Sequence, residues 1–291
     1  MSPALKSLLT VDDLWRLVRV GGLSLAPDGR HAVCSVTRHR LDDDQAMSTL
    51  WLLPTDPGEG PGARQLTRCG DKDGQPAWSP RGDRIAFLGR RRGHDGPGQV
   101  DKTAQLYCIA PDGGEARRHS RVAAGIESFK WLPDGRRIVF SAWVWPHLKG
   151  SAAQARQHKA FEERKESAYV TSEAFYRHWD HHIPQGRVLH LLLLDLASGR
   201  VTDLFEGTAC ELPRDAVGNE VYDVSPDGRR IAFVHDPAPV PLSGNRLALA
   251  EIDLRSRKIK PRVDDRAWDF GAPRFSPDGR RLAVLAAHVA R

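Results

Sequence analysis

The sequence predicts an all-β protein, a β-propeller of four-stranded blades, and two observations carry this prediction. First, a tight turn followed by an apolar strand recurs along the chain, and its clearest copy is Ser225-Pro226-Asp227-Gly228-Arg229-Arg230 before Ile231-Ala232-Phe233-Val234. Second, the prolines of these turns stand at positions 27, 80, 133, 226 and 277, so that most copies are 51–53 residues apart. A period of about 50 residues with four short strands per unit is typical of propeller blades.

The residue types in the turn explain its conformation. Proline presets φ for the second position of a type I turn, aspartate tolerates the third position, and glycine accepts the positive φ that often follows. Each copy therefore predicts a strand, a hairpin turn and a second strand. An apolar residue usually comes just before the turn: Trp78, Trp131, Val224 and Phe275.

Residues 1–20 form a helical segment ahead of the first repeat, with the helix expected over residues 5–20. Thr10 and Asp13 have the spacing of a capping box, in which Thr10 is the N-cap. Leu14, Leu17 and Val18 give the helix one apolar face. We expect this face to pack against the rest of the protein.

The first two blades cover residues 21–70 and 71–122, and the third covers residues 123–210. The third blade contains an insertion at residues 144–187, which explains why its turn and the next are 93 residues apart. Within the insertion, residues 154–168 are rich in Ala, Gln, Glu, Lys and Arg and contain no Gly or Pro, so they predict a helix.

The fourth blade covers residues 211–265, and residues 266–291 supply only the start of a fifth. The predicted domain is thus an incomplete propeller over residues 21–291. A propeller protects its sheet edges by closing, and four blades with an additional hairpin close poorly. We therefore expect the chain to be the front part of a longer protein.

Composition and charge narrow the range of functions. Hydrophobic residues make up 40% of the 291 residues and charged residues 27%, which favours a globular fold. The net charge is +6, but much of the excess is arginine that follows the repeated turns and is spread over several hairpins. Nucleic-acid binding requires basic residues clustered on one face, so we do not expect a nucleic-acid partner.

The cysteines and the chain start indicate the compartment. No cysteine belongs to a C-x-x-C pair, so a zinc site is not expected. We expect no cofactor. Cys34 and Cys108 lie in apolar strand patterns, where buried thiols are common. The first twenty residues lack a signal-peptide core, and no apolar run reaches membrane-spanning length. A cytoplasmic protein without a membrane partner is therefore expected. The four cysteines are Cys34, Cys69, Cys108 and Cys210.

Three features of the sequence resemble known families. The repeated S-P-D-G-R turn resembles the PD40 (WD40-like) repeats of TolB-type propellers and of the N-terminal propeller in prolyl oligopeptidase (S9) serine peptidases. The opening residues 9–20, followed at once by the first repeat, are similar to the start of those peptidases. Tyr176-Arg177-His178-Trp179-Asp180 resembles a segment of their dipeptidyl-peptidase and acylaminoacyl-peptidase branch.

The resemblance implies a role in proteolysis of short peptides. In that family the propeller caps a C-terminal α/β-hydrolase domain, which supplies the catalytic Ser, Asp and His, and the cap admits peptides but not folded proteins. This chain lacks the G-x-S-x-G elbow such a serine needs: Gly22-Leu23-Ser24-Leu25-Ala26 fails at its last position. We expect the chain alone to be inactive, with no catalytic residue. The alternative is a TolB-like propeller that acts as a protein-binding scaffold.

The first candidate for substrate binding is Glu162 with Glu163 on the predicted helix. The resemblance implies this role, because some peptidases of the family hold the free amine of the substrate with paired glutamates on a helix that projects from the propeller. A carboxylate pair attracts an ammonium group. The alternative is a solvated helix face on which Glu162 and Glu166 lie near Lys165.

The second candidate is the segment around Arg177, His178 and Asp180, which the resemblance places near the substrate cavity, with Arg177 available to a carbonyl or carboxylate. A metal site formed by His178 and residues 180–182 is the competing interpretation. Neighbouring residues of a strand point to opposite faces, which argues against that metal site. In a third interpretation Trp179 packs in the fold while Arg177 pairs with Asp180.

Overall fold

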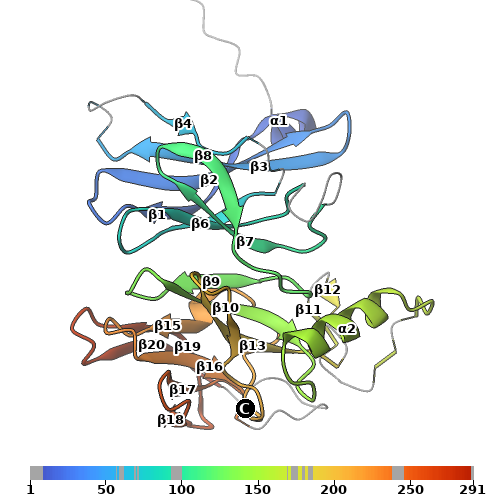
Figure 1. The fold of residues 1–291 in the computed structure, drawn as a ribbon, viewed down its shortest axis with the longest axis vertical. Helices are drawn as coiled ribbons and strands as arrows, with labels where there is room; N and C mark the ends of the chain where they lie inside the picture. The colour runs from blue at the N-terminus through green and yellow to red at the C-terminus, as the bar shows by residue number, and fades with distance from the viewer. Residues whose placement is uncertain are drawn as a thin grey trace, which may run out of the picture. The chain divides into compact units, whose positions relative to one another are not determined.

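The chain is mostly antiparallel β structure in the computed structural model, which describes residues 9–56, 58, 62–68, 70, 72–92, 100–168, 170–171, 176–178, 181–182, 186–237 and 246–289. It divides into two compact units, residues 1–118 and 119–291. The described residues form four four-stranded sheets and two two-stranded sheets (Figure 1). The prediction of a mostly β fold with four-stranded antiparallel sheets is confirmed.

The first unit contains two sheets of four strands, each joined in chain order by antiparallel pairing. Short helix α1 precedes the first sheet. The elements are α1 (Val11–Arg16), β1 (Arg19–Leu25), β2 (His31–Arg40), β3 (Gln45–Pro54) and β4 (Arg64–Gln65), then β5 (Gly74–Trp78), β6 (Ile85–Gly89), β7 (Gln105–Ala110) and β8 (Gly113–Arg118).

The second unit contains two further four-stranded sheets, and a helix with a small hairpin lies between the second and third strands of the first of them (Figure 1). A single 3₁₀ turn, η1 (Asn219–Val221), leads into the second sheet. The elements of the first sheet are β9 (Ser128–Trp131), β10 (Arg137–Val144), α2 (Ser151–Glu162), β11 (Arg177–His178), β12 (His181–His182), β13 (Val188–Asp195) and β14 (Val201–Asp203). The second sheet consists of β15 (Tyr222–Val224), β16 (Arg230–His235), β17 (Ala248–Asp253) and β18 (Ile259–Val263). A two-stranded sheet of β19 (Trp268–Phe275) and β20 (Leu282–His288) follows.

The repeated turns have the predicted geometry. Each turn glycine has a positive φ of 61–71°, a conformation that disfavours any residue with a Cβ. In the copy at residues 225–230, the Gly228 N–H donates to the Ser225 carbonyl at 2.8 Å, and the Arg229 N–H donates to the Asp227 carboxylate at 3.0 Å. The copy with Arg81 in place of aspartate differs, since the Ser79 hydroxyl there bonds to Asp83 instead. The turn glycines are Gly29, Gly82, Gly135, Gly228 and Gly279.

Within each unit, the turn of one sheet lies against the turn of the next. A Cβ built on Gly228 would lie 3.3 Å from Cδ of Pro133, the proline of the preceding turn. Glycine at this position therefore also keeps two successive turns close together. A Cβ built on Gly279 would likewise lie 3.5 Å from Cδ of Pro226, and one built on Gly82 would lie 3.7 Å from Cδ of Pro27.

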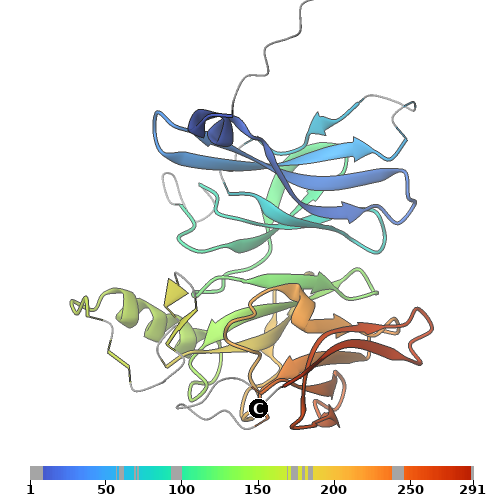
Figure 2. The same ribbon diagram turned by 180° about the vertical axis from the view of Figure 1, so that it is seen from behind.

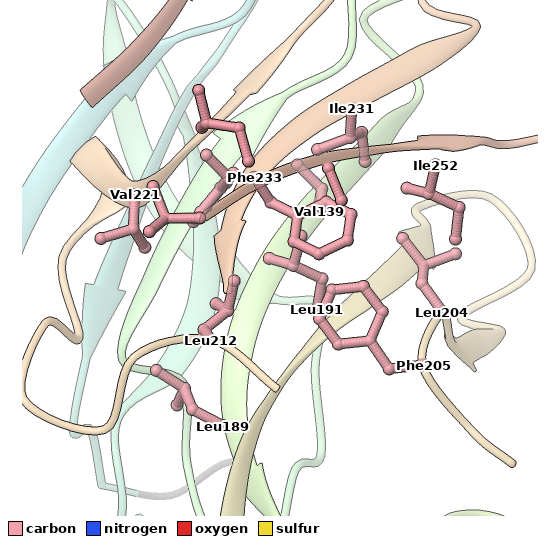
Figure 3. Packing of buried hydrophobic residues seen from close by; sticks show 14 of the residues in the cluster. Val139, Leu189, Leu191, Leu204, Phe205, Leu212, Val221, Ile231, Phe233 and Ile252 are labelled. Atoms are coloured by element: carbon pink, nitrogen blue, oxygen red, sulfur yellow. The ribbon is translucent and has the colours of Figure 1, made fainter. Parts of the chain in front are cut away.

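Each unit has its own apolar core. In the first unit, alternate residues of β2, β3, β6 and β7 meet around Phe87 and Tyr107, whose rings stack with centroids 5.7 Å apart. In the second unit, the β10–β13 face packs on β16 and β17, and Phe205 and Phe233 lie at its centre with ring centroids 4.7 Å apart (Figure 3). Alternate residues of these strands enter the core cluster, while the inner strands β6, β10 and β16 are buried on both faces.

The helices differ from the prediction more than the strands do. Helix α1 spans only Val11–Arg16, although its capping box is present: the Thr10 N–H and hydroxyl both donate to the Asp13 carboxylate at 2.8 Å. Helix α1 contacts β2 as predicted, with the Trp15 ring meeting His39 edge to face, but Leu14, Leu17 and Val18 are exposed and make no buried face. The chain turns extended at Leu17 and enters β1, which ends the helix early.

Candidate functional site

Helix α2 lies beside the end of β10 (Figures 1 and 2). One amide side chain and a cluster of rings hold it there. The Gln154 Nε2 donates to the carbonyls of Trp145 and Leu148, at 2.8 and 3.1 Å, and its Oε1 accepts from the Trp145 N–H at 2.9 Å. The Trp145 ring meets His158 and Phe161 edge to face. The helix is otherwise polar and buries no residue, so these contacts decide where it lies.

The helix spans Ser151–Glu162 rather than residues 154–168. Glu162 is its last residue and Glu163 its C-cap, whose N–H donates to the Lys159 carbonyl. Each glutamate has a partner one turn back: Glu162 lies 3.3 Å from His158 Nε2, and Glu163 lies 3.7 Å from Lys159 Nζ. Both side chains remain accessible to solvent, 39% and 66% exposed.

The segment around Arg177 forms a small hairpin. β11 pairs with β12, with Arg177 opposite His182 and His178 opposite His181. Arg177 is exposed. Asp180, together with Trp179, lies outside the described residues. Among the residues that the structure describes, no three His, Cys, Asp or Glu side chains are placed to hold a metal ion together.

A pocket of about 240 Å³ opens in the second unit beside α2. Its walls come from the end of β10, the first turn of α2, strand β14 and the segment at residues 121–124. Apolar walls are supplied by Trp143, Trp145 and Leu192, while charged residues of both signs stand around them. The titratable lining residues are Arg121, His158, Arg200, Asp203, Glu206 and Arg257.

The acidic residues of this pocket are held in place by the fold. The Asp203 carboxylate faces Nδ1 of the buried His190 at 2.8 Å and accepts from the Phe205 N–H at 2.9 Å. Glu206 accepts from the N–H of Gly150, the N-cap of α2, at 3.0 Å. Each carboxylate accepts a hydrogen bond from a backbone N–H, so the fold positions two acidic groups beside the pocket.

Sequence reasoning missed this pocket. Its residues come from four separated parts of the chain, and no spacing rule brings them together. The signal that could have pointed to it is Ser141-Ala142-Trp143-Val144-Trp145, because two tryptophans at the end of a strand that leads directly into an insertion can line its base. Asp203 and Glu206 have no such signal, since they follow an ordinary hairpin turn.

The comparisons with known proteins point to peptidases. No family model matches the chain. It is 29% identical over 231 residues to dipeptidyl-peptidase 5 of Porphyromonas endodontalis, covering 78% of this chain and 30% of that protein. It is 27% identical to the uncharacterized peptidase YuxL of Bacillus subtilis, covering 79% and 31%, and 27% identical to dipeptidyl-peptidase 5 of Porphyromonas gingivalis, covering 96% and 39%. The chain thus spans less than half the length of these relatives.

Solved structures agree on the fold. An acylaminoacyl peptidase of Pyrococcus horikoshii matches with a TM-score of 0.62 at 13% identity, over 94% of this chain and 36% of that one. The chain therefore has a propeller fold and resembles the propeller part of S9-type peptidases. It is also similar to a protein assigned as TolB from Agrobacterium tumefaciens, with a TM-score of 0.53 at 16% identity over 93% of this chain and 71% of that one. Among the described residues, no helix is long and apolar enough to cross a membrane.

Proposed function

We propose that the chain is the non-catalytic propeller of a serine-type peptidase, and that it controls which peptides reach a separate α/β-hydrolase domain. The observation that carries this proposal is the similarity to peptidases across 78–96% of the chain, while the chain covers only 30–39% of those relatives. The remaining length of the relatives leaves room for a catalytic domain that this chain lacks. Short peptides are the proposed substrates.

Within this proposal, each four-stranded sheet is one blade. Blades one to four correspond to β1–β4, β5–β8, the β9–β14 sheet and β15–β18, and β19 with β20 starts a fifth. Helix α2 and the β11–β12 hairpin belong to the insertion of the third blade. This assignment follows the sequence domains at residues 21–70, 71–122, 123–210, 211–265 and 266–291.

The insertion is the proposed contact with substrate. Glu162 and Glu163 are accessible, are neighbours in the chain and lie at the C-terminal end of α2, which suits capture of a free amine. Arg177, His178 and Asp180 are the proposed neighbours of the bound peptide. Glu162→Ala with Glu163→Ala in the full gene product should weaken binding of peptides with a free amino terminus, and unchanged affinity would remove both glutamates from the proposal.

The test of the main proposal compares two proteins. The 291-residue chain and the product of the gene with any coding sequence after Arg291 are assayed with aminoacyl, dipeptidyl and acyl-aminoacyl chromogenic peptides and a serine-reactive probe. Hydrolysis and labelling by the longer protein alone are expected. Labelling of the 291-residue chain would contradict the absence of a nucleophile.

A second candidate function is a protein-binding scaffold without enzymatic activity. The match to the TolB-type protein favours it, because this chain covers 71% of the TolB-type chain but only 36% of the acylaminoacyl peptidase chain. Inactivity of both proteins toward every peptide class would favour the scaffold over the peptidase.

A further inference from the structure

Strand β14 has a free edge beside the pocket. It is the outermost strand of the sheet β14-β13-β10-β9. The Leu204 N–H bonds to Leu191 and the Arg200 carbonyl accepts from Asp195, so residues 200, 202 and 204 point their polar groups toward β13. Antiparallel pairing alternates, so Val201 and Asp203 point their N–H and C=O groups away from the sheet. Within the described residues, these outward groups make no hydrogen bond.

The pocket runs along this edge. Arg200, Val201, Thr202, Asp203 and Glu206 all line it. Its volume of about 240 Å³ is below the roughly 300–1,000 Å³ of sites that enclose a whole drug-sized ligand. It therefore suits one apolar side chain against Trp143 and Trp145 rather than a complete small molecule. An unpaired strand edge next to a side-chain pocket is the arrangement by which proteins add an extended peptide to a sheet.

Acidic and basic residues lie at opposite ends of the β14 edge. Glu206 lies just past the end of β14, with one carboxylate oxygen bonded to Gly150. Arg200 lies just before its start, and Arg257 lines the same pocket. Both arginines are exposed and form no salt bridge within the described residues. A peptide with a free amino end near Glu206 and a free carboxyl end near the arginines would run antiparallel to β14, the commoner pairing.

We propose that the β14 edge and its pocket form a docking groove for a short extended peptide with free termini, which pairs antiparallel with β14 and places one apolar side chain in the pocket. This inference rests on the proposed handling of peptides, but it concerns a site on the outer edge of a sheet, apart from Glu162 and Glu163. Backbone hydrogen bonds supply affinity without reading sequence, while the pocket and the two charged ends select length and polarity.

Calorimetric titration of the 291-residue chain with a pentapeptide of alternating Leu and Ala tests the groove. Binding is expected, and N-acetylation or C-amidation should each weaken it about tenfold, as loss of a charge-assisted hydrogen bond does. N-methylation of alternate peptide bonds should abolish binding in one register and leave it unchanged in the other. Equal effects of the two methylation patterns, or no binding of any pentapeptide, would overturn the proposal.

Matched variants assign the ends. Glu206→Gln should remove the penalty of N-acetylation, and Arg200→Gln with Arg257→Gln should remove that of C-amidation. The controls Glu166→Gln and Arg255→Gln should change neither, because these residues lie outside the pocket. If N-acetylation and C-amidation still weaken binding to the pocket variants, the proposed direction of the peptide along β14 is wrong, and the docking groove is overturned with it.

The docking experiment and the hydrolysis assay can fail independently, so the groove and the peptidase proposal are tested separately. Hydrolysis by the longer gene product without pentapeptide docking by this chain overturns the groove alone. Docking by this chain together with an inactive longer product overturns the gating role alone and retains the groove.

Discussion

Asp227 shows how one carboxylate holds a repeated turn together. It accepts a 2.6 Å hydrogen bond from the Ser225 hydroxyl and a 3.0 Å bond from the Arg229 N–H. The Ser225 hydroxyl is the main reason that the pKa of Asp227 lies below its usual range, and the Arg229 N–H adds to it. The aspartate thus fixes both sides of the turn, which explains its place in the repeat.

Replacing Asp227 by alanine should lower the free energy of unfolding by about 1 kcal/mol, the typical net contribution of an exposed hydrogen-bonded group. Urea denaturation measures the change. Asp42→Ala is the control, since Asp42 is exposed and makes no hydrogen bond within the described residues. An equal effect of the two variants would mean that the turn does not need the carboxylate.

The same hydrogen bonds set the response to acid. The pKa of Asp227 is lowered mainly by the Ser225 hydroxyl, and that of Asp253 mainly by the Ser256 N–H. A lowered pKa in the folded state stabilises the fold fully above the unfolded value of about 3.9, and the stabilisation is lost as pH falls through the folded value. The melting temperature should therefore drop below about pH 4, and less steeply when both residues are changed to Asn. If the melting temperature of the double variant falls with pH as steeply as that of the unchanged protein, these two aspartates do not account for the acid response.

Burial decides the chemistry of the thiols. Removal from water raises the pKa of the Cys108 thiol to about 12, and it also raises the pKa of Cys34 and Cys210. Since the thiolate is the reactive form, Cys108 should resist alkylation at pH 8 in the folded protein and react fully in urea. Peptide mass mapping after iodoacetamide treatment measures this, and rapid native labelling of Cys108 would contradict its burial. The prediction that Cys34 and Cys108 are buried is confirmed.

At the scale of elements, local signals predicted the turns and strands well. A Pro-Asp-Gly turn determines its own backbone from neighbouring residues, so its strands follow within a residue or two. Helix ends are decided by contacts farther away. Residues 164–168 have the composition of a helix, but the last ring contact with Trp145 is made by Phe161, and the helix ends directly after it.

Gln154 should hold α2 in place. Gln154→Ala removes three hydrogen bonds and leaves the Trp145 N–H and two carbonyls without their partner. We expect hydrogen exchange in residues 151–162 to rise at least about tenfold, which corresponds to about 1.4 kcal/mol. Gln157→Ala is the matched control, because Gln157 lies on the exposed side of the same helix. Equal exchange in both variants would show that the ring cluster alone anchors α2.

At the scale of the whole molecule, the two cores should respond separately to mutation. Phe205 is fully buried and contacts Phe233 in the second unit. Phe205→Ala should cost about 3–5 kcal/mol, the range for removing a buried ring, and should reduce hydrogen-exchange protection in residues 119–291. Protection in residues 1–118 should stay unchanged, and Phe87→Ala should show the reverse. Loss of protection in both units from either variant would contradict separate cores.

The candidate sites mark the limit of sequence reasoning at this scale. Glu162 and Glu163 could be named because they are neighbours in the chain, and the structure leaves them accessible. The pocket could not be named, since Trp145, Asp203 and Glu206 meet only through packing of α2 on a sheet. Burial of the apolar face of α1 could not be predicted for a related reason. A pattern shows which residues are apolar, but their burial depends on what lies beside them.

The close contact between Gly228 and Pro133 has a consequence for how such a chain changes over generations. These two positions, 95 residues apart in the sequence, must suit each other, because the second turn packs against the first. A change to either alone disturbs a neighbour, whereas duplication or loss of a complete repeat brings a matching proline and glycine with it. Growth and shrinkage of this architecture should therefore proceed in whole repeats, and long additions such as the one that carries α2 should appear between strands, away from the stacked turns.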